Sequence, residues 1–348
     1  MGNSHLSHEV SFVVDVHIRP YPLSAISMQR FRVVEDSMRP TLVPGDEFVV
    51  TSTRPPRVGE IVTFQKPGQA GFWMVKRMTA GPGNPVDGRG TLGPDEAWVL
   101  SDNRGATEAD SRTLGAIPLN ALRPVVTHLD PGTFAEAAQL LGREEPALSE
   151  IVDRHGMPVF WERAPGFPTL VWLILEQQVS LESGAAMYRR LSQLVGEMTP
   201  ERLARLDDGD LRDIGVTRQK TSYLLGLARS ICAGDVDVEA LSSMSAEDAR
   251  GVLTGIRGIG AWTADAYLLS ALRLPDVFPL GDRALQVGAA ETLGMSAPMT
   301  EAELEMVAEP WRPLRAVAAR LIWHAYLVNR GRVEPADPGA GHPASPYA

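Results

Sequence analysis

The sequence of 348 residues is poor in cysteine, in positive charge and in long apolar runs. Its single cysteine, Cys232, cannot form a disulfide framework and excludes an iron–sulfur cluster held by four cysteines. No apolar run approaches the roughly 20 residues of a membrane span. The N-terminus lacks the basic start and apolar stretch of a secretory signal. We therefore expect a cytoplasmic protein that contacts no membrane and needs no cofactor or metal.

The formal net charge of −10 counts against strong nucleic-acid binding, because proteins of that class are usually basic. A local basic strip can still hold a phosphate backbone, since total charge governs only long-range attraction. Scattered, solvated side chains are the alternative for the candidates of the C-terminal half, which are Arg218, Lys220, Arg229, Arg257, Arg283 and Arg315. Any binding should be weak and salt-sensitive.

Apolar patterning changes once along the chain. Short apolar runs separated by Pro and Gly predict a compact β domain with strands at Glu47–Val50, Glu60–Phe64, Phe72–Met78 and Ala97–Leu100. Pro and Gly break this pattern at residues 128–132, and helical spacing follows from Thr133–Gly142 onward.

Helix-start signals then recur, namely Thr199 before Pro200, Thr217, Ser245 with Asp248, and Thr300 with Glu303. We predict a multidomain fold: an extension at 1–28 with a strand near Val10–Ile18, a β-rich domain at 29–128, an all-α domain at 133–331, and a disordered tail at 332–348.

Four segments of the β domain form a recurring series: residues 37–42 (SMRPTL), 58–62 (VGEIV), 75–78 (VKRM), and 101–104 (SDNR) leading to 110–112 (DSR). Taken alone, Ser37 fits a turn serine, and strand alternation would turn Lys76 toward solvent. Together the segments resemble the signal-peptidase and LexA-type Ser/Lys peptidases, in particular their soluble members.

That resemblance implies a serine nucleophile at Ser37 and a lysine base at Lys76. Such chemistry needs a lysine whose ammonium form is disfavoured by burial, so that a neutral amine can take the serine proton. The resemblance makes Asp102, Arg104, Asp110 and Arg112 structural ion pairs. It also implies a protein substrate, unless the domain is an inert binding module. Ser101 departs from the family, which usually has Gly there.

The helical half is organised around residues 253–285. A helix end is followed by the turn Gly258-Ile259-Gly260, a helix from about Ala261, and a carboxylate at Asp282. Glycines allow close backbone approach, and the free N–H groups that start a helix suit a phosphate. On residues alone, Asp282 could simply cap the next helix.

This arrangement resembles the helix-hairpin-helix DNA glycosylases, specifically their alkylbase (3-methyladenine) branch, over Thr133–Gly331. The resemblance implies damaged double-stranded DNA as partner. It implies a catalytic carboxylate at Asp282, and DNA contacts from Gly258, Ile259, Gly260 and Thr263.

Two further roles follow from the resemblance. Relatives that also cut the strand have a lysine where this chain has Trp262, which predicts base removal only, with Trp262 stacking on an electron-poor base in the pocket. The segment 169–180 reads as an apolar helix ending in two glutamines, of which Gln178 fills the gap left by an extruded nucleotide. Helix-end solvation is the alternative for Gln178. Tyr267, Trp172 and Trp311 are pocket candidates that core packing explains better.

The sequence thus predicts a monofunctional glycosylase for alkylated bases, fused to a Ser/Lys peptidase-like domain. Two alternatives remain open: a serine endopeptidase brought to DNA by a binding-only helical domain, and a damage sensor that flips bases without cleaving them.

Overall fold

The computed structural model describes residues 11–13, 28–52, 54–160 and 163–332. It divides the chain into two compact units, residues 1–127 and 128–348. The disordered tail expected at 332–348 lies outside the described residues except for Arg332, as does most of the N-terminal extension. Of the strand expected at Val10–Ile18, only β1 (Ser11–Val13) is described.

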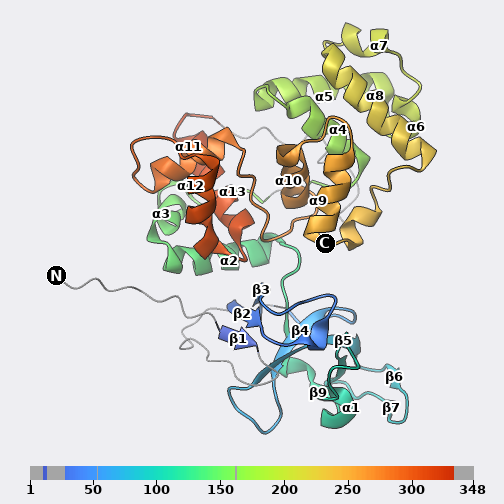
Figure 1. The fold of residues 1–348 in the computed structure, drawn as a ribbon, viewed down its shortest axis with the longest axis vertical. Helices are drawn as coiled ribbons and strands as arrows, with labels where there is room; N and C mark the ends of the chain where they lie inside the picture. Colours follow the sequence, from blue (N-terminus) through green and yellow to red (C-terminus); the bar gives the residue numbers. More distant parts are fainter. Residues whose placement is uncertain (1–10, 14–27, 53, 161–162, 333–348) are drawn as a thin grey trace, which may run out of the picture. The chain divides into compact units, whose positions relative to one another are not determined.

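The first unit is strand-rich (Figure 1). One sheet has the order β1-β2-β3, and a five-stranded sheet has the order β10-β4-β5-β8-β9. The remaining pair, β6 and β7, forms a small hairpin. The strands after β1 are β2 (Gln29–Val33), β3 (Glu47–Val50), β4 (Ile61–Gln65), β5 (Trp73–Ala80), β6 (Pro85–Val86), β7 (Gly90–Thr91), β8 (Glu96–Leu100), β9 (Ile117–Pro118) and β10 (Arg123–Pro124). The four strands expected from the short apolar runs are confirmed as β3, β4, β5 and β8.

Strand β5 is the middle strand of the larger sheet, and both of its faces are covered. Trp73 and Val75 pack into one apolar cluster, whereas Met74 and Met78 pack into another. Alternation along this strand therefore offers no solvent face, and every side chain from Trp73 to Lys76 is buried. Short helical segments complete the unit: η1 (Asp36–Met38), α1 (Ser111–Leu114) and η2 (Leu119–Ala121).

All described secondary structure of the second unit is helical, as predicted. Its α-helices are α2 (Pro131–Glu144), α3 (Pro146–His155), α4 (Phe167–Glu176), α5 (Leu181–Val195), α6 (Pro200–Leu203), α7 (Asp208–Asp213), α8 (Arg218–Ala233), α9 (Ala246–Gly255), α10 (Ala261–Ser270), α11 (Arg283–Thr292), α12 (Glu301–Ala308) and α13 (Arg315–Val328). Figure 1 shows two groups, one of α4 to α10 and one of α2, α3 and α11 to α13. The chain crosses between the groups twice, before α4 and after α10.

The predicted helix starts are largely as expected. Thr199 and Thr217 cap α6 and α8 by accepting from backbone N–H groups, and Thr300 with Glu303 forms a reciprocal capping box on α12. Ser245 caps α9 by accepting from the N–H of Asp248, and the Ser245 hydroxyl donates to the Asp248 carboxylate at 2.7 Å.

Candidate functional site

The hairpin between α9 and α10 has two glycines with different reasons to be glycine. Gly258 has φ +95°, and a Cβ there would lie 2.2 Å from Cγ of Tyr223. Gly260 has φ −88°, and a Cβ there would meet no atom within 4 Å. The fold itself therefore requires Gly258, whereas the space beside Gly260 is open. Gly260 also caps α10 without a side chain to accept from the first N–H groups of the helix, which stay available to a ligand.

Ile259 and Thr263 present little side chain to the outside of this hairpin. Ile259 is 3% exposed, and its N–H donates to the carbonyl of Ile256. Thr263 is 2% exposed and accepts a hydrogen bond from Gln177. The burial of both side chains therefore disfavours direct side-chain contacts to an outside ligand, and the N–H of Ile259 is already engaged within the turn.

Asp282 is held by three donors. Its Oδ1 accepts from the N–H of Leu285 at 2.8 Å and from the indole of Trp323 at 2.9 Å. Its Oδ2 accepts from the indole of Trp262 at 2.7 Å. Asp282 is thus the N-cap of α11, and it is also a pocket residue, because it lines the same cavity as Trp262 and Trp323. The capping and catalytic interpretations are compatible.

The cavity has a volume of about 380 Å³ and lies where the two helix groups meet. Trp262 and Ser270 reach it from α10, and Trp323 and Tyr326 from α13. A size of a few hundred Å³ suits a small planar ligand such as a nucleobase. The indole of Trp262 donates along its edge to Asp282, which leaves its ring faces as the surface for stacking.

The three aromatic residues considered as either pocket or core residues do not line this cavity. Tyr267, Trp172 and Trp311 are 0%, 4% and 2% exposed. The hydroxyl oxygen of Tyr267 accepts a hydrogen bond from the N–H of Gly166 at 2.8 Å. Their assignment to core packing is confirmed.

Sequence reasoning missed Trp323 and a Glu–Arg ion pair on another wall of the cavity. Trp323 lies in the apolar part of α13, one turn before Tyr326. The only sequence signal for a pocket position was this pair of aromatic side chains, each with a polar group, on one face of the helix. Glu176 lines the cavity beside Arg163, which lies 3.3 Å away, and the Glu176 carboxylate accepts from Trp172 at 2.6 Å. Nothing in the local pattern of α4 distinguishes Glu176 from a helix-end carboxylate.

The expected helix over residues 169–180 is wrong at its C-terminal end. Helix α4 ends at Glu176, and Gln178 has φ +56°, in the left-handed region. Gln178 is exposed, whereas Gln177 is half-buried and donates to the carbonyl of Gly258 at 2.8 Å. A residue with positive φ cannot continue a helix, so the chain turns before the next helix, α5.

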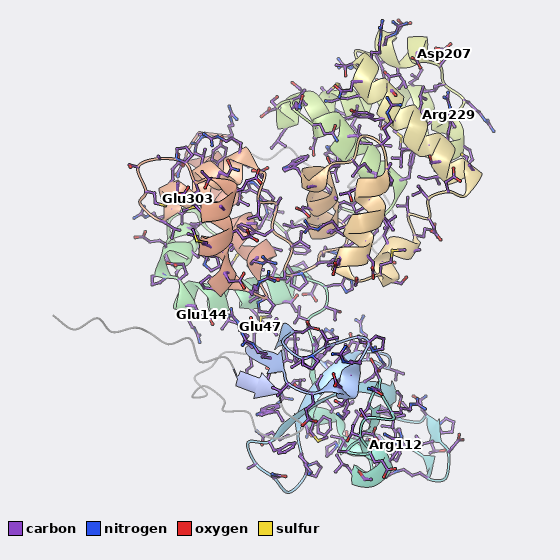
Figure 2. The ribbon with its side chains drawn as sticks, in the orientation of Figure 1. Glu47, Arg112, Glu144, Asp207, Arg229 and Glu303 are labelled. Carbon is purple, nitrogen blue, oxygen red and sulfur yellow. The ribbon has the colours of Figure 1, made fainter. Side chains whose placement is uncertain are left out.

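The proposed basic strip loses two members. Lys220 is 7% exposed and donates to the carbonyl of Leu175 at 2.7 Å, and burial lowers its pKa. Arg315 forms an ion pair with Asp276 at 2.9 Å. Arg218, Arg229, Arg257 and Arg283 are exposed, and Arg229 stands out on α8 in Figure 2.

The first unit brings Ser37 and Lys76 together. Lys76 is 0% exposed, and its Nζ donates to Oγ of Ser37 at 3.0 Å. Ser37 lies on η1 and is 5% exposed. The solvent-facing interpretation of Lys76 is wrong, because the strand is covered on both faces.

The segment after β8 forms hydrogen bonds with Ser37 and with Arg77, the neighbour of Lys76. The N–H of Asn103 donates to the carbonyl of Ser37 at 2.9 Å. Asp102 pairs with Arg77, the neighbour of Lys76, at 2.6 Å. Burial alone would raise the pKa of Asp102, but hydrogen bonds from Arg77 and Thr41 outweigh it and hold that pKa below its ordinary value.

The other expected ion pair is Asp110 with Arg112, at 2.9 Å (Arg112 is labelled in Figure 2). Arg104 takes part through its carbonyl, which accepts from Arg112 at 3.4 Å, and its charge helps to lower the pKa of Asp102. Ser101, where the family usually has Gly, is 2% exposed.

Two family models match the chain, one in each unit. Residues 171–313 match the HhH-GPD superfamily of base excision DNA repair proteins. Residues 10–92 match signal peptidase, peptidase S26. Among the described residues, no helix has both the length and the apolar character needed to cross a membrane.

Relatives of the helical unit share a name. A DNA-3-methyladenine glycosylase of Bacillus subtilis is 31% identical over 169 residues, which are 45% of this chain and 56% of that protein. DNA-3-methyladenine glycosylase 2 of Escherichia coli is 30% identical over 177 residues, which are 47% of this chain and 60% of that protein. The chain thus spans less than two thirds of the length of these relatives.

Solved structures agree on the fold. The DNA-3-methyladenine glycosidase of Bacillus halodurans is 28% identical with a TM-score of 0.50, covering 59% of this chain and 96% of that one. The 3-methyladenine DNA glycosylase of Schizosaccharomyces pombe, solved with abasic DNA, has a TM-score of 0.50 at 23% identity, covering 54% and 95%. The helical unit therefore contains an HhH-GPD domain with DNA-3-methyladenine glycosylase homologues, and the strand-rich unit matches the signal peptidase family.

Proposed function

We propose that the helical unit is a monofunctional DNA glycosylase that releases alkylated bases of the 3-methyladenine type from double-stranded DNA. The observation that carries the proposal is the Asp282 carboxylate, which lines a base-sized cavity between the indoles of Trp262 and Trp323. The names of the relatives support the choice of substrate.

The chemistry follows from the charge that develops in the reaction. Breaking the bond between base and sugar leaves positive charge on the sugar, and a fixed carboxylate stabilises that charge. Three donors orient Asp282, so its role is electrostatic rather than that of a strong base. A cationic base leaves readily, and the faces of Trp262 attract it with about 0.5–2 kcal/mol.

DNA is held, in this proposal, by groups that read no sequence. The free N–H groups at the start of α10 donate to a phosphate beside Gly260, where no side chain intervenes. The target nucleotide is then flipped into the cavity, and Gln178 fills the gap it leaves. Exposed arginines such as Arg257, next to the hairpin, add salt-sensitive attraction.

The test is base release from a duplex that carries 3-methyladenine or hypoxanthine. Wild type should yield free base and an alkali-labile site, and Asp282→Asn should bind the duplex without releasing the base. Asn keeps an oxygen for capping α11, so the fold should persist. Binding without release by the wild type would instead indicate a damage sensor, and unchanged release by Asp282→Asn would refute the assignment.

We propose a second activity for the first unit, serine peptidase chemistry at Ser37 with Lys76 as base. The 3.0 Å contact between their side chains and the complete burial of Lys76 favour it over an inert module. A neutral amine there would take the proton of Ser37 as it attacks a peptide carbonyl. Incubation of the full chain with a randomised peptide library should give cleavage by the wild type and none by Ser37→Ala. Equal cleavage by both would exclude Ser37. If the wild type cleaves peptides and releases no base, the endopeptidase with a DNA-binding helical unit is the better account.

A further inference from the structure

The turn between α4 and α5 lies between the hairpin and the cavity. Gln177 donates its side-chain amide to the carbonyl of Gly258 at 2.8 Å and to Oγ1 of Thr263 at 2.9 Å. Two residues further on, Val179 and Ser180 line the cavity. Gln178 therefore lies in a turn whose one end is hydrogen-bonded to the hairpin and whose other end lines the cavity, and its side chain is exposed.

The same turn is anchored on its other sides. Lys220 donates to the carbonyl of Leu175 in the last turn of α4. Ser180 begins α5 by accepting from the N–H of Ser183 at 3.2 Å. Within this frame Gln178 adopts φ +56°, a conformation that a non-glycine residue keeps only where its surroundings fix it. The side-chain amide of Gln177 ties this turn directly to the hairpin.

We propose that Gln177 is a positioning residue that holds Gln178 at a fixed distance from the hairpin. Binding of a phosphate by the hairpin then places Gln178 where it can fill the gap left by the extruded nucleotide. This rests on the proposed glycosylase function. When the hairpin binds a phosphate, the two hydrogen bonds of Gln177 hold the exposed Gln178 at a fixed offset from that phosphate. Without them, the hairpin still binds DNA, but Gln178 no longer enters the base stack at the right place.

Flipping from a stable pair should need this coupling most, because unstacking and unpairing cost less when the base is unpaired. The informative quantity is therefore the ratio of base release from a paired lesion to release from the same lesion opposite an abasic site. The variant is Gln177→Leu, which keeps the volume and removes the amide. We expect this ratio to fall about tenfold, the effect of losing roughly 1.4 kcal/mol of hydrogen bonding, with duplex binding changed less than threefold.

Two matched variants separate positioning from general loosening. Lys220→Met removes the anchor on Leu175 but leaves the link to the hairpin, and it should leave the ratio near that of the wild type. Gln178→Ala should itself lower the ratio. In the Gln178→Ala background, adding Gln177→Leu should lower it no further, since Gln177 acts through Gln178.

The outcomes are distinguishable. A wild type that releases no base from either substrate refutes the proposed function. Active wild type with an unchanged ratio in Gln177→Leu overturns the positioning role alone. Additive losses in the double variant overturn it too, because they would show that Gln177 acts independently of Gln178. If Lys220→Met reproduces the defect, loosening of α4 explains it and the proposal falls.

Discussion

Trp323 donates its indole N–H to Oδ1 of Asp282 over 2.9 Å, which joins α13 to the cap of α11. We predict that Trp323→Phe slows base release by about 10- to 100-fold. A hydrogen bond to a charged group contributes roughly 1.5–3 kcal/mol, and Phe retains the packing of the ring without the donor. Single-turnover base release from a 3-methyladenine duplex measures the effect.

The matched variant is Trp262→Phe, which removes the donor to Oδ2. It should slow release by a similar factor and keep stacking on the base, whereas Trp262→Ala should lose both. A Trp323→Phe enzyme as fast as the wild type would show that the orientation of Asp282 does not depend on this indole.

The hairpin, Asp282 and the Ser37–Lys76 pair could be predicted because their chemistry is local in the sequence or repeated in a known order. Gly258 lies in the turn between α9 and α10, and Asp282 stands at the start of α11. The burial of Lys76 could not be read from alternation, because the second cluster that covers β5 also draws on residues from a later strand, such as Ala97 and Val99 of β8. Alternation of side chains along a strand predicts a solvent-exposed face only when one face of the sheet stays uncovered.

The contacts of Gln177 and Trp323 were invisible for a related reason. Each reaches a partner many residues away, Gly258 at a separation of 81 and Asp282 at a separation of 41. No local sequence pattern around these residues indicates which distant residue each one contacts. The helical pattern also overran the end of α4, since Gln177 and Gln178 are good helix formers and only the tertiary turn at Gln178 stops them.

The two hairpin glycines should respond differently to alanine. Gly258→Ala should destabilise the helical unit by about 2–4 kcal/mol, because φ +95° is strained for alanine and the methyl would overlap the ring of Tyr223. Gly260→Ala should cost at most about 1 kcal/mol, since it alters only the cap. Denaturant unfolding measures both.

Gly260, which matters less for stability than Gly258, should matter more for DNA binding. Gly260→Ala should weaken binding to any duplex although the protein stays folded, because its methyl would occupy the open space where we propose that a phosphate binds. Fluorescence anisotropy with undamaged DNA at low salt would test this. Full binding by a folded Gly260→Ala protein would mean that the phosphate does not lie beside Gly260.

Asp265 should make the stability of the two hairpin helices depend on pH. It lies on α10, 4% exposed, and pairs with Arg250 of α9 at 2.6 Å. Burial raises the pKa of Asp265 to about 6, although Arg250 and Arg315 oppose the shift. A carboxyl whose pKa is raised by folding adds stability below its unfolded pKa near 3.8, and that stability is lost as the pH rises through about 6.

We therefore expect the wild type to gain roughly 1–2 kcal/mol relative to Asp265→Asn when the pH falls from 7.5 to 5. Amide hydrogen exchange of α9 and α10, corrected for its intrinsic pH dependence, reports the local opening free energy. A wild-type advantage that shrinks toward pH 5 would show that the pKa of Asp265 is lowered rather than raised.

The connection between the units should resist self-cleavage by the Ser37–Lys76 pair. The N–H of Val126 donates to the carbonyl of Val49 in the first unit, and the N–H of Leu129 donates to the carbonyl of Arg273 in the second. Leu129 is 5% exposed, so only Thr127 and His128 separate two anchored residues. A peptidase that binds its substrate as an added strand needs an extended segment of several residues, which this connection does not offer.

After prolonged incubation, intact-mass measurement should give the same full-length mass for wild type and Ser37→Ala. A wild-type fragment with a new end between residues 126 and 130, absent from Ser37→Ala, would show that the connection opens and is itself the substrate.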